Sequence, residues 1–306
     1  MKRVITIMCL ALVIPTTAVA MSFSPWEPAV NAEDVPGTSE DLNTSAVDGC
    51  PIQSPDGLSL YMASNRPRFA GDVRTDLDIW VAHRESVDAP WGAPVNVGAP
   101  INSSADDFCP TPVRGHGLFF VSRKVVSGIT CGMGDIYFTR FTRPRGWAAP
   151  ELLACGADGG PNSALDEQGP SYVETDAGAF LYFSSGPDIY ASERRRDGSF
   201  GTAAAVGELN TGAADIQPNV RKDGLEIVFA SNRVGAAGQD IWMSSREDAG
   251  DRWSPPVNLG GAVNTAAAET RPSFSWDGST LYFGRNPGPE GSSDIFVTTR
   301  SRVAGD

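Results

Sequence analysis

The triplet Asp-Ile-aromatic recurs five times along the chain, and this repetition constrains the fold more than any other feature. Successive copies start 52 to 57 residues apart. The five copies are Asp78-Ile79-Trp80, Asp135-Ile136-Tyr137, Asp188-Ile189-Tyr190, Asp240-Ile241-Trp242 and Asp294-Ile295-Phe296. Self-similarity at such a period is typical of a protein built from repeated supersecondary units.

Each triplet lies within the same local pattern of strands and turns. An apolar and aromatic run such as Leu281-Tyr282-Phe283 precedes it, and before that run comes a turn, as at Asp56-Gly57. Asp-Gly favours tight hairpins because both central positions need positive φ. An aromatic residue after the triplet opens a fourth strand: Trp91, Trp147, Phe200 and Trp253. Each repeat therefore predicts a meander of four short strands, named A to D below, which is a propeller blade.

The repeats resemble a known family. Ser54-Pro55-Asp56-Gly57 followed by Asp78-Ile79-Trp80 is similar to PD40 repeats, the WD40-like repeats of TolB-like propellers. The resemblance covers essentially residues 22–306 and implies a β-propeller. It implies little about activity, since such blades occur in binding proteins, in side domains of proteases and in some lyases.

The two ends of the chain are expected to complete one ring. The fifth repeat ends at Arg300 without a strand D, while Trp26–Asn31 resembles Trp253–Asn258, the strand D region of the fourth repeat. We therefore expect an all-β fold, a single five-bladed propeller over residues 21–306. Residues 21–47 would supply the outer strand of the last blade, which removes two unpaired sheet edges.

The first twenty residues predict a secretory signal peptide. Lys2 and Arg3 precede an apolar run from Val4 to Ile14, and Ala18-Val19-Ala20 forms a small-residue cleavage site. The run is too short for a membrane anchor. We expect residues 1–20 to be removed and the protein to be secreted or periplasmic, without a transmembrane segment.

Charge and composition exclude two classes of protein. The chain has 37 acidic and 24 basic residues, a formal net charge of −13. Such a surface repels phosphate backbones, so we expect no nucleic-acid partner. Seven Trp, six Tyr and fourteen Phe can fill a core, which argues against disorder.

Four cysteines remain after the signal peptide, and the blade pattern suggests how they pair. Cys131 lies before strand C of the second blade and Cys155 after its strand D, so we expect a Cys131–Cys155 disulfide. Cys50 and Cys109 each precede a proline at the start of strand A in adjacent blades, and we expect a second disulfide between them. The alternative is Cys109–Cys131.

A polar signature recurs in every connection from strand D to the next strand A. An Asn-Ser or Asn-Thr pair is followed by an acid three residues before a proline. These acids are Asp48, Asp107, Glu167, Asp215 and Glu269. A feature present in every blade is expected to be scaffold, with the Asn and Ser or Thr shaping the turn. The functional alternative is a carboxylate ring that holds a cation such as calcium, and we expect no other cofactor.

An uneven set of arginines suggests where a ligand would bind. Arg66, Arg123, Arg233 and Arg285 follow strand B in four blades and are expected to pair with these acids, whereas the third blade lacks one. Its loop between strands B and C is also the shortest, which predicts a notch in that face. The candidate ligand-binding residues are Asp107, Asp166, Glu167, Gln168, Asp215, Arg66 and Arg233.

Familiar catalytic motifs are missing from the sequence. There is no Gly-x-Ser-x-Gly elbow and no phosphate-binding loop. His83 and His116, the two histidines, do not have the spacing of metal ligands. The repeated aspartates of the triplets are expected to cap turns.

Two functions of different classes follow. The sequence favours a monomeric, non-catalytic propeller that binds a protein, peptide or glycan across one face. The alternative is a carbohydrate-active enzyme, a glycosidase or lyase, with carboxylates in the central channel. An acid unique to one blade would favour the enzyme. The one candidate is Glu174, whose counterparts Arg114, Lys222 and Trp276 in other blades are not acidic.

Overall fold

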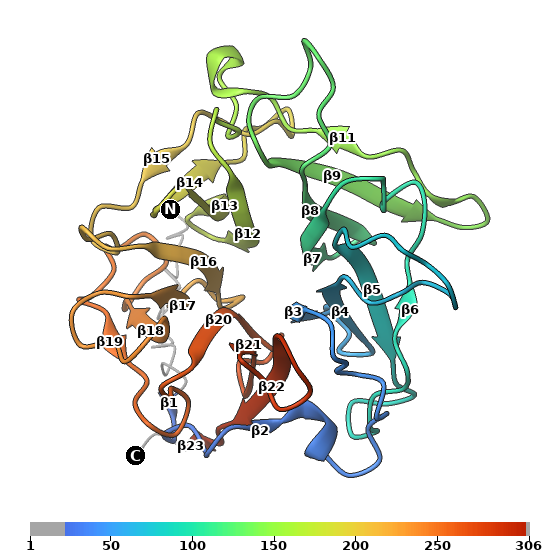
Figure 1. Ribbon diagram of the computed structural model, residues 1–306. Coiled ribbons are helices and arrows are strands. Elements are labelled where there is room, and N and C mark those ends of the chain that lie inside the picture. The colour runs from blue at the N-terminus through green and yellow to red at the C-terminus, as the bar shows by residue number, and fades with distance from the viewer. Residues whose placement is uncertain (1–21, 304–306) are drawn as a thin grey trace, which may run out of the picture.

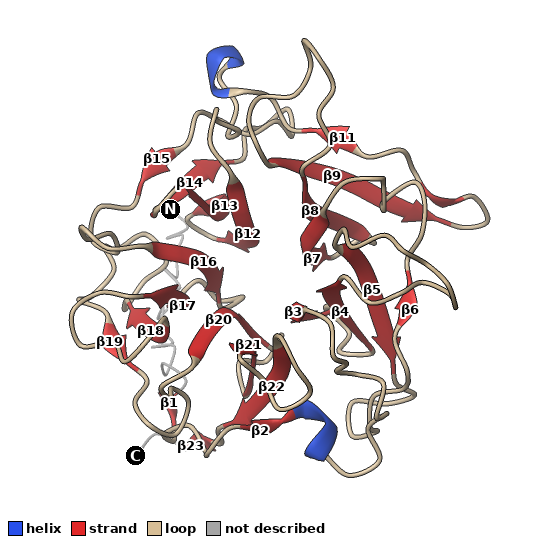
Figure 2. Ribbon diagram, viewed as in Figure 1, coloured by secondary structure: helices blue, strands red, loops and turns tan. Residues whose placement is uncertain are grey.

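The computed structural model describes residues 22–303, which form a ring of five β-sheets around a central axis (Figure 1). Within this range the helical elements are two short 3-10 turns, η1 (Ala32–Asp34) and η2 (Gly156–Asp158) (Figure 2). The fold is therefore the all-β, five-bladed propeller that the repeats predict. No helix in this part of the chain is long and apolar enough to cross a membrane.

The blades follow one another along the chain, each with its strands in meander order from the axis outward. Blade one is β3 (Asp48–Gln53), β4 (Ser59–Ser64), β5 (Asp78–His83) and β6 (Val95–Asn96). Blade two is β7 (Asp107–Val113), β8 (Gly117–Ser122) and β9 (Asp135–Thr142), with β10 (Gly146–Trp147) and β11 (Glu151–Leu152) both paired to β9. Blade three is β12 (Glu167–Thr175), β13 (Gly178–Ser185), β14 (Asp188–Glu193) and β15 (Ala204–Ala205). Blade four is β16 (Asp215–Val220), β17 (Glu226–Ser231), β18 (Asp240–Ser245) and β19 (Val257–Asn258).

Blade five is completed by the amino end of the described chain. Its strands are β20 (Ala268–Phe274), β21 (Thr280–Asn286), β22 (Asp294–Thr299) and β2 (Val30–Asn31). β2 pairs antiparallel with β22, Val30 opposite Val297, so blue and red strands lie side by side in Figure 1. A second pair, β1 (Ser22–Phe23) with β23 (Arg302–Val303), joins the two ends again. The predicted signal peptide lies outside the described residues.

The outer strands are shorter than the sequence suggests. They contain two residues each, and Trp91, Phe200 and Trp253 lie ahead of them instead of opening them. These rings are buried. Burying a large ring contributes more free energy than one added backbone pair on an exposed edge.

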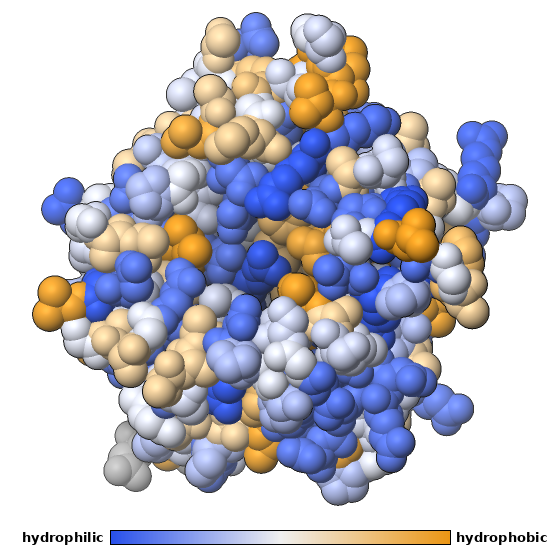
Figure 3. Space-filling model, in the orientation of Figure 1, coloured by the Kyte–Doolittle hydropathy of each residue, from blue (hydrophilic) through white to orange (hydrophobic). Residues whose placement is uncertain are grey.

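The hydrophobic core lies between neighbouring blades. One cluster joins Tyr182 and Ile189 of blade three to Phe229, Trp242 and Trp253 of blade four. Polar residues are left for the outside, and Figure 3 shows mostly hydrophilic side chains around the centre of the face in view. Because each blade buries one face against the next, each blade interface contributes to the stability of the ring.

One hydrogen-bond pattern fixes the chain at every blade. The Asn of each D-to-A connection accepts from the backbone N–H of the Ile in an Asp-Ile-aromatic triplet and donates to the carbonyl of the same Ile. The accepted bonds are 2.7–2.8 Å long: Asn43 with Ile295, Asn102 with Ile79, Asn162 with Ile136, Asn210 with Ile189, and Asn264 with Ile241. We call this pair of bonds the Asn clamp. At Asn43 it joins residues 252 positions apart.

The structure contains one of the two expected disulfides. Cys131 and Cys155 are bonded, while Cys50 and Cys109 are buried free thiols. The predicted Cys50–Cys109 disulfide is therefore wrong, and the alternative Cys109–Cys131 disulfide is not formed either. The two free thiols do meet at the axis, but through a hydrogen bond.

Asn43→Ala is expected to destabilise the ring more than its counterpart Asn264→Ala. Both substitutions leave a buried Ile N–H and C=O without partners, which costs roughly 2–4 kcal/mol. Each amide also donates to an Asn of the outer strand, Asn43 to Asn31 of β2 at 2.8 Å and Asn264 to Asn258 of β19 at 2.9 Å. Because β2 comes from the other end of the chain, only the loss of Asn43 loosens the closing strand. Chemical denaturation and limited proteolysis of β2 would measure this. Equal stability of Asn43→Ala and the parent chain would contradict the role of the clamp.

Candidate functional site

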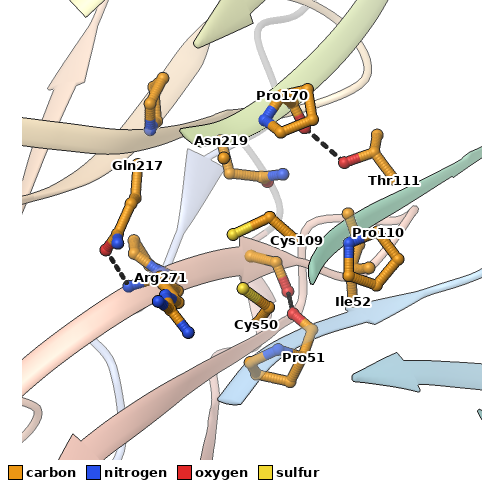
Figure 4. A pocket seen from close by; sticks show the side chains of 14 residues that line it. Cys50, Pro51, Ile52, Cys109, Pro110, Thr111, Pro170, Gln217, Asn219 and Arg271 are labelled. Atoms are coloured by element: carbon orange, nitrogen blue, oxygen red, sulfur yellow. Dashed lines mark hydrogen bonds between the residues drawn. The ribbon is translucent and has the colours of Figure 1, made fainter. Parts of the chain in front are cut away.

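The central channel is too narrow to hold a sugar. Each strand A carries a residue at positive φ directly before a proline: Cys50, Cys109, Gly169, Gln217 and Arg271. The β-bulges at these positions bring the backbone close to the axis and leave a cavity of about 30 Å³ (Figure 4). That is room for about one water molecule. No carboxylate of the described chain lines it, so the expectation of carboxylates in the central channel is wrong.

Two thiols and a guanidinium share this cavity. Burial raises the pKa of Cys50 well above its ordinary value. Burial would also raise that of Cys109, but the hydrogen bond with Cys50 and the Arg271 charge outweigh it and lower its pKa to about 7. The bulges turn both side chains toward the axis, where Arg271 can compensate a thiolate. The two side chains therefore lie in the cavity as a hydrogen-bonded pair of free thiols.

Three of the four predicted acid–arginine pairs form at the face that carries the D-to-A connections, and the expected pairing of Arg123 with Asp107 is wrong. Asp48 pairs with Arg66 at 2.6 Å, Asp215 with Arg233 at 2.5 Å and Glu269 with Arg285 at 2.8 Å. All three carboxylates are fully buried. Removing one partner from such a pair leaves an uncompensated buried charge, so these pairs are part of the scaffold.

Asp107 and Glu167 have no arginine partner among the described residues. Arg123 instead bridges Asp106 at 3.0 Å and Asp166 at 2.7 Å. Glu167 accepts from the hydroxyls of Ser163 and Ser185. Burial raises the pKa of Glu167, and it raises that of Asp107 to about 6.

The seven candidate ligand residues on this face therefore have unequal access to solvent. Arg66, Asp107, Glu167 and Asp215 are buried, whereas Asp166, Gln168 and Arg233 are partly exposed. Gln168 is engaged on both sides: it donates to Asp166 at 2.8 Å and accepts from Gln217 at 2.9 Å. Residues 22–303 contain no group of three or more His, Cys, Asp or Glu placed to hold a metal ion. A ligand or a calcium ion at this face stays a prediction.

The opposite mouth of the channel holds a larger pocket. The strand A of each blade ends there in its A-to-B turn, and the equivalent turn positions are Pro55, Arg114, Glu174, Lys222 and Trp276. The last four, from four different blades, line a cavity of about 350 Å³, which we call the turn pocket. Its other lining residues are Val113, Phe119, Phe138, Arg140, Tyr172 and Arg194.

Tyr172 and Glu174 form a hydrogen-bonded pair in the turn pocket. Both lie on β12, two residues apart and therefore on the same face of the strand. The Tyr172 hydroxyl donates to Glu174 Oε2 at 3.4 Å. Burial, then the Glu174 charge, raises the pKa of Tyr172, so the phenol keeps its proton at neutral pH. The Glu174 carboxylate is exposed to the pocket.

Basic groups surround this pair. Arg114 and Lys222 lie over the ring of Trp276, at 5.0 and 4.9 Å from its centroid. The Lys222 ammonium donates to the Tyr172 carbonyl at 2.8 Å, and burial lowers its pKa to about 8. Arg140 and Arg194 come from the ends of the C strands of blades two and three.

A second cavity of about 620 Å³ adjoins the turn pocket and shares Val113 and Arg114 with it. It lies between blades one and two and is lined by both histidines, His83 and His116, together with Trp147. Nothing in the repeat pattern predicts that the two histidines lie close together. They meet because His116 occupies the A-to-B turn of blade two and His83 ends strand C of blade one.

Comparison with known proteins identifies the fold but no family. No family model and no curated protein matches this chain. Among solved structures, a thermostable family-43 glycoside hydrolase is 12% identical with a TM-score of 0.54, over 88% of this chain and 93% of its own. A GH43 endo-arabinanase from Bacillus licheniformis is 12% identical with a TM-score of 0.53, over 88% and 97%. A family 117 glycoside hydrolase from Zobellia galactanivorans is 14% identical with a TM-score of 0.55, over 92% and 90%.

These neighbours correct the main functional expectation. These three proteins, which share the ring over nearly its whole length, are glycoside hydrolases, so we abandon the non-catalytic binding scaffold. The expectation of acids in the channel failed for a physical reason: the channel is closed by the bulges, and the exposed acid Glu174 lies in the turn pocket at its mouth. At such low identity the likeness itself shows the fold alone.

Asp107→Asn is expected to stabilise the protein at neutral pH. In the parent protein, the pKa of Asp107 in the folded state is about 6, above the ordinary value of 3.8, so the folded state binds this proton more tightly than the unfolded state. Stability is therefore lost as pH rises from about 4 through 6. At pH 7 the variant should gain roughly 1–3 kcal/mol, and the gain should vanish below about pH 4.

Denaturation at several pH values would measure this, with Asp215→Asn as the matched control. Asp215 is equivalent in the fold but is paired with Arg233, so its substitution should destabilise the protein at pH 7. An Asp107→Asn variant no more stable than the parent at pH 7 would contradict the prediction.

Proposed function

We propose that this protein is a carbohydrate-active enzyme that cleaves a glycosidic bond in the turn pocket. The observation that carries the proposal is the Tyr172–Glu174 pair, a protonated phenol hydrogen-bonded to an exposed carboxylate, inside a cavity formed by four blades. The glycoside hydrolases among the structural neighbours support the substrate class.

The size and lining of the turn pocket suit a sugar. A cavity of about 350 Å³ lies in the range of small-ligand sites, which combine an apolar floor with a few polar groups. Phe119 and Phe138, with ring centroids 4.7 Å apart, form part of that floor. Glu174, Tyr172 and the basic side chains then supply the polar contacts.

The pair can both accept and donate a proton. Glu174 is a carboxylate open to a substrate, and Tyr172 is a weak acid at the same place. Most glycoside hydrolases use two carboxylates, but Glu174 is the one carboxylate among the described residues that line this pocket. We therefore assign proton abstraction to Glu174 and proton donation to Tyr172.

We also propose that the enzyme acts outside the cytoplasm. The Cys131–Cys155 disulfide supports this, because such bonds persist in oxidising compartments. The secretory signal in residues 1–20, the PD40 repeat assignment and a monomeric state are further parts of the proposal.

Glu174→Gln is expected to lower the rate of sugar cleavage by about 10²–10⁴-fold, since the amide cannot accept a proton. Tyr172→Phe should have a similar effect. Release of new chain ends from a panel of neutral and acidic oligosaccharides would measure the rate. Folding should be unchanged because Glu174 is exposed.

The matched control is Glu151→Gln, which removes an equally exposed carboxylate on β11, outside the pocket. It should retain full activity. Cleavage that survives Glu174→Gln would exclude Glu174 as the catalytic base, and no cleavage across the panel would contradict the proposed function.

A further inference from the structure

The turn pocket carries an excess of positive charge that the cleavage chemistry alone does not require. Arg114, Arg140, Arg194 and Lys222 line it against the single acid Glu174. This is the reverse of the whole chain, whose formal net charge is −13. A basic pocket on an acidic protein points to an anionic ligand.

The pocket cations are not neutralised by carboxylates of the described chain. Among the described residues none of the four forms an ion pair, whereas eight arginines elsewhere do: Arg66, Arg68, Arg74, Arg123, Arg221, Arg233, Arg285 and Arg300. The latter hold the scaffold together. The pocket cations are left with their charges available to a ligand.

Lys222 has a partly buried charge that no carboxylate of the described chain neutralises. Its ammonium is half-buried against Trp276 and donates to the Tyr172 carbonyl, without a carboxylate to compensate its charge. Such a cation favours an arriving anion strongly, because the anion restores the solvation that burial removed. The guanidinium groups beside it can bind a carboxylate through two parallel hydrogen bonds.

We propose that the substrate is a saccharide of uronic acids and that the enzyme cleaves it by β-elimination; this rests on the proposed function of the turn pocket. The basic groups hold the carboxylate on C5 of the sugar that is attacked. Their charges stabilise the enolate that forms when C5 loses its proton.

The groups in the pocket balance this reaction. Glu174 takes the proton from C5, and the electron pair of the C5–H bond forms a double bond between C4 and C5. The bond from C4 to the bridging oxygen breaks, and that oxygen takes the proton of Tyr172. Glu174 then returns its proton to the phenolate through their hydrogen bond, which restores the starting state without another reactant.

Elimination also explains the missing second carboxylate. Hydrolysis by a pair of acids needs a nucleophile or a base opposite the proton donor. Elimination needs one base, one acid and positive charge at the sugar carboxylate. The turn pocket provides these three and, in the described chain, no second acid.

The test compares oligosaccharides of equal length that differ in charge. The probes are uronate trimers of several epimers, a sulfated neutral-sugar trimer and the uncharged trimer. Calorimetry would measure binding, and ultraviolet absorbance with mass spectrometry would detect the conjugated double bond of an elimination product. A uronate trimer should bind at least tenfold more tightly than the uncharged one and yield unsaturated ends.

Variants assign the effect to the pocket. Arg114→Gln and Lys222→Gln should each weaken binding of the uronate trimer about tenfold and leave the weak binding of the uncharged trimer unchanged. Arg252→Gln, an exposed arginine in the loop between β18 and β19, is the control and should alter neither.

The outcomes separate this inference from the proposed function. Saturated products, equal binding of charged and uncharged trimers, or a preference for sulfate would overturn the inference while an enzyme at Glu174 stands. Charge-selective binding of uronate without any cleavage would overturn both elimination and the proposed function, leaving a uronate-binding pocket.

Discussion

The Asn clamp is the interaction on which the rest of the structure depends. In every blade one amide side chain satisfies both backbone groups of a buried Ile, and so fixes the D-to-A connection against strand C. The acid a few residues later then begins the next strand A at a set distance from the axis. Because a buried N–H or C=O is costly to leave unpaired, the amide is difficult to replace, and the clamp recurs unchanged in all five blades.

The same geometry places the structural residues at the channel and the variable residues at its mouth. The bulges bring five backbones to the axis and close the channel to about 30 Å³, so the centre of this propeller cannot admit a sugar. The A-to-B turns beyond them are under no such constraint. There each blade presents a different side chain, and the positions that vary, with Glu174, Arg114 and Lys222 among them, form the pocket.

The repeats made the fold, the closing strand and three of the four acid–arginine pairs predictable, because each can be checked against equivalent positions in the other blades. The pocket could be predicted only in part. The sequence singles out Glu174 as the unmatched acid, but it does not show that the channel narrows beside this residue. Tyr172, Arg140 and Arg194 were missed, since they belong to no repeated pattern. Cys50 and Cys109 do face each other, yet their positive φ and the nearby charge of Arg271 cannot be read from the sequence.

The pairing of β1 with β23 places the two ends of the described chain within hydrogen-bonding distance of each other. Because the five blades are nearly equivalent, the packing of the ring does not depend on which blade contains the chain ends. Joining residues 22 and 303 by a short linker and opening the long loop between β4 and β5 would leave every blade interface in place. The order in which the blades are synthesised is therefore separable from the order in which they pack, and this propeller is a natural subject for circular permutation.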